Sequence, residues 1–200
     1  MSRPEIVLAS SSKIRSEILD RAGVSHICDA ADIDEGEIKN RYIKDGNTVE
    51  DAAMALAEAK AATVERRHLG RLVIGADQIL ECGGRWFDKP EDEGAAKETL
   101  TALRGRDHQL VTAVAVFRDG EVVWRHQETV RLTMRDVSDA FIEHYVREES
   151  PDILDSVGAY RLEQTGAQLF ERIDGDFFTV LGLPLLPLLG FLRQAGALED

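Results

Sequence analysis

The stretch Glu5-Ile-Val-Leu-Ala-Ser-Ser-Ser-Lys-Ile-Arg-Ser-Glu-Ile-Leu19 decides how this fold begins. Residues 6–9 form a short apolar run that predicts a buried strand, and the serines after it predict a turn into a helix ending near Gly23. Serine hydroxyls, backbone N–H groups at a helix N-terminus and the cations Lys13 and Arg15 together favour a bound phosphate or carboxylate. The same residues also fit a plain serine N-cap with solvated cations, and the stretch alone leaves both explanations open.

The composition is that of a soluble globular protein. The chain has 200 residues, of which 44% are hydrophobic and 30% charged, enough for one ample core or two small lobes. A net charge of −13 argues against general nucleic-acid binding, which requires a basic face. Cys28 and Cys82 stand in neither a CxxC nor a metal-ligand spacing, which indicates reduced thiols and a cytoplasmic protein.

No segment is expected to enter a membrane. The N-terminus does not resemble a signal peptide, because Pro4 and Glu5 interrupt it. The longest apolar tract, residues 180–192, is broken by two glycines and two prolines. It is also shorter than the ~20 apolar residues that span a bilayer, so a C-terminal core helix is the better explanation.

The order of apolar runs, helix caps and glycines predicts a mixed α/β fold. Residues 71–77 are expected to form a second buried strand. Turns at 83–84 and 119–120 predict hairpins over residues 79–87 and 109–132. Further helices are expected at residues 48–68, 91–103, 138–148 and 184–195.

The remaining segments are expected to be an acidic loop over residues 29–47 and two strands over residues 167–173 and 177–181. This order favours an elongated mixed β-sheet flanked by helices over a doubly wound fold. We expect a single domain over residues 1–200 and leave open whether it forms two lobes around a cleft.

Four charged residues are candidates for chemistry, and each also has a plain structural explanation. Asp77 follows an apolar strand, where it could hold a metal or accept a proton from water, or simply cap a turn. Glu35 could complete a metal site, although acidic loops are usually just solvated. Lys60 is expected on the surface of a helix. Lys89 precedes a proline that restricts its backbone, and it could reach a phosphate.

Eight segments, each unspecific alone, occur in a characteristic order over nearly the whole chain. They are Leu8-Ala-Ser-Ser-Ser-Lys-Ile-Arg15, Ile33-Asp-Glu35, Ala57-Glu-Ala-Lys60, Gly75-Ala-Asp77, Asp88-Lys-Pro90, Leu103-Arg-Gly105 with His108, Gly158-Ala-Tyr160 and Val180-Leu-Gly-Leu-Pro184. Taken together, they resemble the Maf family of nucleoside triphosphate pyrophosphatases.

The resemblance implies an elongated mixed α/β structure with a central cleft, related to the inosine triphosphatase fold, and commonly a homodimer. It implies hydrolysis of a nucleoside triphosphate to the monophosphate and pyrophosphate, with Mg²⁺ or Mn²⁺ as the divalent cation. Asp77 matches the catalytic acid–base position and is expected to hold the metal together with Glu35. The positions that match the family's phosphate contacts are Ser10, Arg15, Lys60 and Lys89.

Three positions follow base preference in the family: here they are Ile14, Gln78 and Glu163. This set is closer to the branch that acts on 7-methyl-GTP than to the pyrimidine-preferring branch, which resembles Arg, Thr and Gln. Ile14 stands where the 7-methyl-GTP branch tends to have an aromatic, and it cannot supply base stacking worth ~1–3 kcal/mol. The Glu163 carboxylate could accept from the N1–H and amine of guanine, and the Gln78 amide could donate to O6. Lys13 replaces the family's usual proline.

Two other functions stay open. One is a nucleotide-binding regulator of cell division with little turnover, and the other is a pyrophosphatase that prefers dTTP or UTP. The presence of Asp77 beside three candidate phosphate-binding cations favours retained chemistry, because a pure binding protein has no need of a base.

Overall fold

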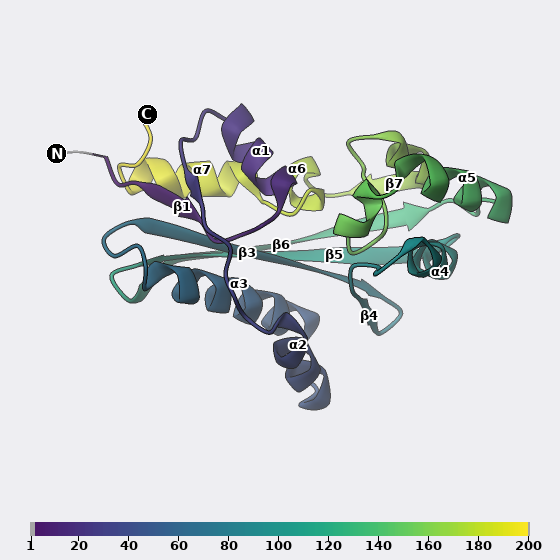
Figure 1. The fold of residues 1–200 in the computed structure, drawn as a ribbon, viewed down its shortest axis with the longest axis horizontal. Helices are drawn as coiled ribbons and strands as arrows, with labels where there is room; N and C mark the ends of the chain where they lie inside the picture. Colours follow the sequence, from purple (N-terminus) through teal and green to yellow (C-terminus); the bar gives the residue numbers. More distant parts are fainter. Residues whose placement is uncertain (1–2, 200) are drawn as a thin grey trace. The chain divides into compact units, whose positions relative to one another are not determined.

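The computed structural model describes residues 3–199, which contain a seven-stranded sheet and seven α-helices (Figure 1). The strand order is β2-β1-β3-β5-β6-β7, and β4 pairs with β3. The strands are β1 (Ile6–Leu8), β2 (Ile27–Cys28), β3 (Leu72–Cys82), β4 (Arg85–Phe87), β5 (Asp107–Arg118), β6 (Glu121–Met134) and β7 (Phe170–Asp174). β1 is parallel to β2 and β3, whereas β4 is antiparallel to β3 and β7 to β6. The predicted mixed α/β class is therefore confirmed.

The helices occupy most of the connections between strands. They are α1 (Lys13–Arg21), α2 (Glu35–Lys44), α3 (Val49–Glu65), α4 (Glu93–Leu103), α5 (Asp139–Glu149), α6 (Phe177–Val180) and α7 (Leu185–Gln194), with short 3₁₀ turns at Asp152–Asp155 and Thr165–Leu169. Within residues 3–199, no helix combines the length and the apolar composition needed to cross a bilayer. Cytoplasmic location and the homodimer stay predictions.

The chain divides into two compact units, which are described separately. Unit 1 comprises Met1–Asp77, Thr112–Glu128 and Gly182–Asp200, and unit 2 comprises Gln78–Val111 and Thr129–Leu181. Strand β3 leaves unit 1 after Asp77 and enters unit 2 at Gln78. That two lobes enclose a cleft stays a prediction.

In unit 1, α3 lies on one side of the strands and α1 and α7 lie on the other (Figure 1). The contact between α3 and β3 is unusually close at Gly75. A Cβ atom there would lie 2.1 Å from the carbonyl oxygen of Ala57 and 2.7 Å from the backbone nitrogen of Ala61. Only a glycine opposite small helix residues permits this approach, because any side chain would overlap the helix backbone.

Local sequence predicted most elements correctly. Both hairpins form, with Gly83 and Gly84 between β3 and β4, and Asp119 and Gly120 between β5 and β6. All four of these turn residues have positive φ angles, as tight hairpin turns require. Thr48 caps α3 and shares a reciprocal capping box with Asp51.

Three predictions of local structure were wrong. Asp77 was expected to end a strand over residues 71–77, but β3 continues through it to Cys82, where it pairs with β4. Residues 29–47 contain the helix α2, none of whose residues is fully buried. Its start is marked by the Asp34 cap, whose carboxylate accepts from Glu37 N at 2.8 Å. Residues 177–181 form the short helix α6, not a strand. The Asp176 carboxylate accepts from Thr179 N at 2.9 Å and starts this helix despite its aromatic and β-branched residues. The predicted strand over 167–173 begins only at Phe170, after a 3₁₀ turn.

The core of unit 2 includes a buried imidazole. His108 and Tyr160 are both buried, and His108 Nε2 lies 3.0 Å from the Tyr160 hydroxyl. Burial lowers the pKa of His108 to about 4 and raises that of Tyr160 above its ordinary value. His108 is therefore neutral in the folded protein near neutral pH and packs in the core against Tyr160 and Phe170.

The stability of the protein should fall on acidification because of His108. The unfolded chain binds a proton at this residue near pH 6.5, whereas the folded protein resists until about pH 4, so stability is lost as the pH falls between these values. From pH 7 to pH 5 the loss from this residue is about 2 kcal/mol. Urea unfolding of His108→Gln should show a correspondingly flatter pH dependence. His144→Gln, on the exposed face of α5, is the matched control, and equal slopes for all three proteins would contradict the assignment.

Candidate functional site

A lysine ammonium lies between two carboxylates in unit 1. Lys60, in the middle of α3, places Nζ 2.6 Å from Asp77 Oδ1 and 2.8 Å from Glu35 Oε1. The side chains of Lys60 and Asp77 are only 10% and 8% exposed, whereas Glu35 is about half exposed, at 52%. The expectation of a surface lysine was wrong, because the tight packing of α3 on β3 carries Lys60 inward.

The electrostatics of Asp77 suit a proton acceptor. Burial raises its pKa above the ordinary value of a carboxyl group, and the positive charges of Lys60 and Arg15 oppose that rise. A carboxylate held partly out of water accepts a proton more readily than an exposed one, while the adjacent ammonium keeps its charged form accessible.

The serine turn both caps a helix and holds Arg15. Ser12 is the N-cap of α1, and its hydroxyl accepts from Arg15 N at 3.5 Å. The hydroxyl of Ser10 accepts from Ser12 N at 3.2 Å and from Arg15 Nη1 at 3.3 Å. The two explanations left open by the sequence, a cap and a polar site, are therefore compatible.

The guanidinium of Arg15 connects three segments of unit 1. Besides contacting Ser10, it donates from Nη1 to the carbonyl of Ala76 at 2.9 Å and from Nε to that of Gly182 at 2.7 Å. Burial lowers the pKa of Arg15, and the carboxylates of Asp77 and Glu35 oppose this shift. Arg15 thus joins the middle of β3, at Ala76, to the serine turn, a role that the sequence did not indicate.

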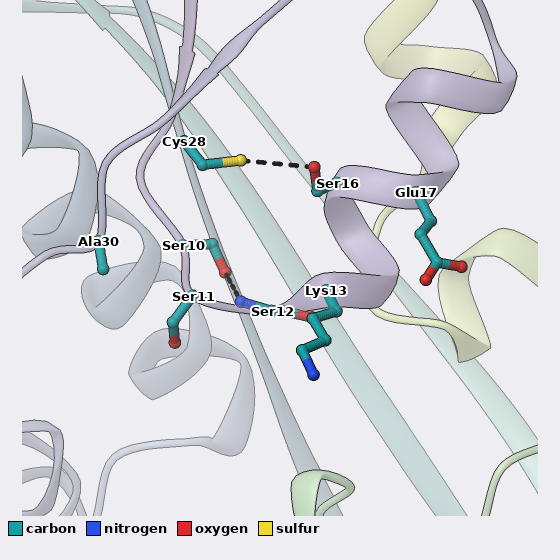
Figure 2. Close-up of a pocket in the computed structure, with 8 residues that line it drawn as sticks. All are labelled: Ser10, Ser11, Ser12, Lys13, Ser16, Glu17, Cys28 and Ala30. Atoms are coloured by element: carbon teal, nitrogen blue, oxygen red, sulfur yellow. Dashed lines mark hydrogen bonds between the residues drawn. The ribbon is translucent and has the colours of Figure 1, made fainter. Parts of the chain in front are cut away.

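A pocket of about 470 Å³ opens beside the serine turn (Figure 2). Its wall consists of Ser10, Ser11, Ser12, Lys13, Ser16, Glu17, Cys28 and Ala30. Hydroxyl groups, the first-turn backbone of α1 and the exposed ammonium of Lys13 give this wall the chemistry of an anion site, partly offset by Glu17. Ile14, on the same helix turn, is half-buried and does not line the pocket.

The other predicted site residues lie in unit 2. Gln78 donates from Nε2 to the carbonyls of Thr179 and Val180, at 2.9 and 3.2 Å. Donation from this amide to a base would therefore require these bonds to break. Lys89 is exposed.

Glu163 accepts from Arg161 Nε at 3.1 Å, and Arg161 Nη1 lies 2.6 Å from Asp152. Arg161 was not predicted as a site residue, although a cation two residues from a candidate carboxylate was an available signal. This ion pair holds one carboxylate oxygen of Glu163 in place.

The oxygen donors near Lys60 are compatible with one kind of metal site. Within the described residues, no three His, Cys, Asp or Glu side chains converge as a preformed metal cage. Mg²⁺ is commonly bound by one or two carboxylates, with substrate phosphates and water completing its shell. Glu35 and Asp77, drawn to the same ammonium, form such a pair of hard oxygen donors.

The fold and this site define an α/β protein with a serine turn that lines a pocket and a buried aspartate paired with a lysine. The chain matches the family described as Maf-like protein over residues 5–195, so it belongs to the Maf family. This confirms the resemblance found in the sequence.

Named relatives are similar over almost their full length. A nucleoside triphosphate pyrophosphatase of Paramagnetospirillum magneticum is 46% identical over 96% of this chain and 99% of its own. A 7-methyl-GTP pyrophosphatase of Rhizobium meliloti is 46% identical over 98% and 99%. A crystal structure of a nucleoside-triphosphatase / dITP/XTP pyrophosphatase from Mycobacterium abscessus is 18% identical over 66% of this chain and 75% of that one, with a TM-score of 0.37. That last similarity is too weak to support an argument about the site.

Removing the Lys60 ammonium should destabilise the protein in a pH-dependent way. In Lys60→Met the buried Asp77 carboxylate loses its partner, which costs about 3–5 kcal/mol near neutral pH. The loss should shrink as the pH falls and Asp77 becomes protonated, because the unpaired buried charge then disappears. Urea unfolding between pH 4 and pH 8 measures this difference.

The matched control is Lys97→Met, which removes an exposed ion pair with Glu143 on the surface of unit 2. Its effect should stay below about 1 kcal/mol at every pH. A Lys60→Met effect as small as the control would show that the Lys60–Asp77 pair does not stabilise the fold.

Proposed function

We propose that this chain is a nucleoside triphosphate pyrophosphatase, which hydrolyses a nucleoside triphosphate to the monophosphate and pyrophosphate. The observation that carries the proposal is the buried Asp77–Lys60 pair, joined by Glu35, in the same unit as the serine pocket. Membership of the Maf family and relatives named as nucleoside triphosphate pyrophosphatases support it. These features together supply a base, cations and an anion-binding turn.

The proposed reaction is attack of water on the α-phosphorus. The bond from this phosphorus to the α,β-bridging oxygen breaks, and pyrophosphate leaves with the electron pair. Asp77 accepts a proton from the attacking water, and its raised pKa makes it a better base than an exposed aspartate. The phosphates already carry negative charge, so the barrier falls mainly through positioning and charge neutralisation rather than through a covalent nucleophile.

Other residues have proposed roles in holding the phosphate chain. Ser10 and Lys13 line the pocket and can donate to phosphate oxygens. Arg15 is already bonded to Ser10 and two backbone carbonyls, so it contributes positive charge and holds the turn in place. Lys60 orients Asp77, and Lys89, exposed in unit 2, is kept as a phosphate contact on the strength of the resemblance.

We propose that Glu35 and Asp77 hold a divalent cation, Mg²⁺ or Mn²⁺, whose remaining ligands are water and phosphate oxygens. When bound, such an ion withdraws charge from the phosphate and acidifies the attacking water. Lys60 keeps the two carboxylates close together, which reduces the cost of assembling the site.

For the base, we propose a guanine nucleotide, with 7-methyl-GTP among the candidates. Relatives of equal identity carry the general name and the 7-methyl-GTP name, so the argument rests on Glu163. Its carboxylate, held in place by Arg161, can accept from both N–H donors on the guanine edge. Uracil offers only one N–H donor there, so Glu163 should discriminate between the two bases.

Replacement of the base tests the proposed reaction. Asp77→Asn keeps the shape of the side chain but cannot accept the proton, and kcat for pyrophosphate release should fall by about 10²–10⁴-fold. The assay uses canonical and methylated triphosphates with Mg²⁺ or Mn²⁺. Asp119→Asn, in a hairpin turn of the same unit, is the control and should retain the wild-type kcat.

Two outcomes would contradict the proposal. Asp77→Asn could keep wild-type turnover with the same metal dependence, in which case Asp77 is not the base. The unaltered protein could instead bind triphosphates without releasing pyrophosphate, which would favour the nucleotide-binding regulator.

Glu163→Gln tests the base preference. The amide has one acceptor oxygen and no charge, so kcat/KM for GTP and 7-methyl-GTP relative to UTP should fall about tenfold or more, as the loss of a charge-assisted hydrogen bond predicts. Glu171→Gln, exposed on β7, serves as the control. An unchanged ratio would rule out Glu163 as a guanine contact, and a wild-type preference for UTP or dTTP would assign the chain to the pyrimidine branch.

A further inference from the structure

A second group of reactive side chains meets the pocket beside the serine turn. Cys28 is an exposed free thiol on the edge strand β2, and both it and Ser16 line the pocket. Figure 2 shows the sulfur of Cys28 directed at the Ser16 hydroxyl of α1, and the two atoms are 3.4 Å apart. Ser16 Oγ in turn lies 2.9 Å from His26 Nε2. Thiol, hydroxyl and imidazole form one continuous chain.

The hydrogen-bond partners fix the direction of this chain. His26 Nδ1 lies 2.9 Å from the carbonyl oxygen of Val24, and a carbonyl can only accept, so Nδ1 carries a proton. In the neutral imidazole Nε2 is then an acceptor and receives the Ser16 hydroxyl proton. The Ser16 oxygen is left to accept from the Cys28 thiol. Every proton in the chain therefore points from the sulfur towards a basic nitrogen.

The surroundings hold this arrangement in place. Cys28 pairs with Leu8 across the β1–β2 ladder, and the carbonyl of Leu8 accepts from Asp29 N at 3.0 Å. The backbone thus holds Cys28 opposite Leu8, which comes two residues before Ser10 in the serine turn. The His26 side chain is only 3% exposed, and Asp20 Oδ1 lies 3.7 Å from its Nδ1.

We infer that Cys28 is a modification site: a nucleophilic thiol that forms mixed disulfides with low-molecular-weight disulfides entering the pocket. The thiol proton passes through Ser16 to His26 Nε2, and the thiolate attacks one sulfur of the small disulfide. A bond forms between that sulfur and Cys28, the original S–S bond breaks, and the departing thiolate takes up a proton. Cys28 is oxidised and the small disulfide is reduced, so the exchange is balanced without another reactant.

A consequence for activity rests on the proposed function. The group attached to Cys28 would occupy the pocket whose wall includes Ser10 and Lys13, the proposed phosphate contacts. Modification and substrate binding would then exclude each other. The thiol–disulfide balance of the surroundings would thereby control how much of the protein can bind a triphosphate.

The first test measures thiol reactivity alone. The native chain is treated with 4,4′-dithiodipyridine at pH 7, and peptide mass spectrometry assigns the modified cysteine. Cys28 should react at least about tenfold faster than in Ser16→Ala or His26→Gln, since an ordinary thiol is only a few per cent ionised at this pH. Ser16→Thr keeps a hydroxyl and should restore most of the rate.

The buried Cys82 is the internal reference, because it should react only in a protein that has unfolded. A variant in which Cys82 becomes labelled has unfolded and is excluded from the comparison. The Cys28 rates of Ser16→Thr and His26→Gln then still test the inference. Equal Cys28 rates in the wild type, Ser16→Ala and His26→Gln would overturn the inference. So would a wild-type Cys28 that fails to react.

The second test links the thiol to the pocket. Glutathione disulfide should abolish pyrophosphate release in the wild type, dithiothreitol should restore it, and the Cys28→Ser rate should not respond to either reagent. If the protein modified at Cys28 keeps the KM and kcat of the unmodified protein, the attached group does not block the pocket. If the protein has no pyrophosphatase activity, the proposed function fails while the reactivity test still decides the chemistry of Cys28.

Discussion

The buried contact of the Lys60 ammonium with two carboxylates is the interaction on which unit 1 depends most. A charge removed from water is costly unless partners surround it, and here the partners come from α2 and β3 while the lysine comes from α3. Glu35 is the first residue of α2, so its contact with Lys60 joins the start of this helix to α3. One ion cluster thus contributes to the local fold and supplies the proposed base.

Arg15 is a second cation that joins segments of unit 1 that are far apart in the sequence. Its guanidinium reaches carbonyl groups 61 and 167 positions away along the chain, at Ala76 and Gly182. A bidentate cation that satisfies backbone oxygens is stiffer than a solvated one, so the serine turn is held with little freedom. This explains how a residue expected to touch phosphate can serve the site without offering all its donors to a ligand.

Much of the fold could be predicted from the sequence because its signals are local. Caps such as Thr48, and glycines in the hairpin turns, act on their own neighbours, and they located most elements within a few residues. α2 was missed because its acidic residues, with Gly36 and Gly46, are typical of a loop, although Asp34 caps a helix there. α6 was missed because its composition favours strands while Asp176 starts a helix. The inward position of Lys60 was not predictable locally, since it depends on contacts with residues far along the chain. The site residues came from the ordered resemblance, and their partners came only from the structure.

The close approach at Gly75 has a consequence for how the protein can change. Because the helix backbone rests on the strand there, main-chain atoms set how far α3 lies from β3. At this separation the Lys60 side chain reaches from α3 to the Asp77 carboxylate. Gly75, Ala57 and Ala61 have no reactive side chains, yet their close packing sets the distance between Lys60 and Asp77. A larger residue at any of them would separate donor from acceptor and admit water between them. Gly75 and the two alanines opposite it therefore tolerate little change in side-chain size, although none of them takes part in the proposed reaction.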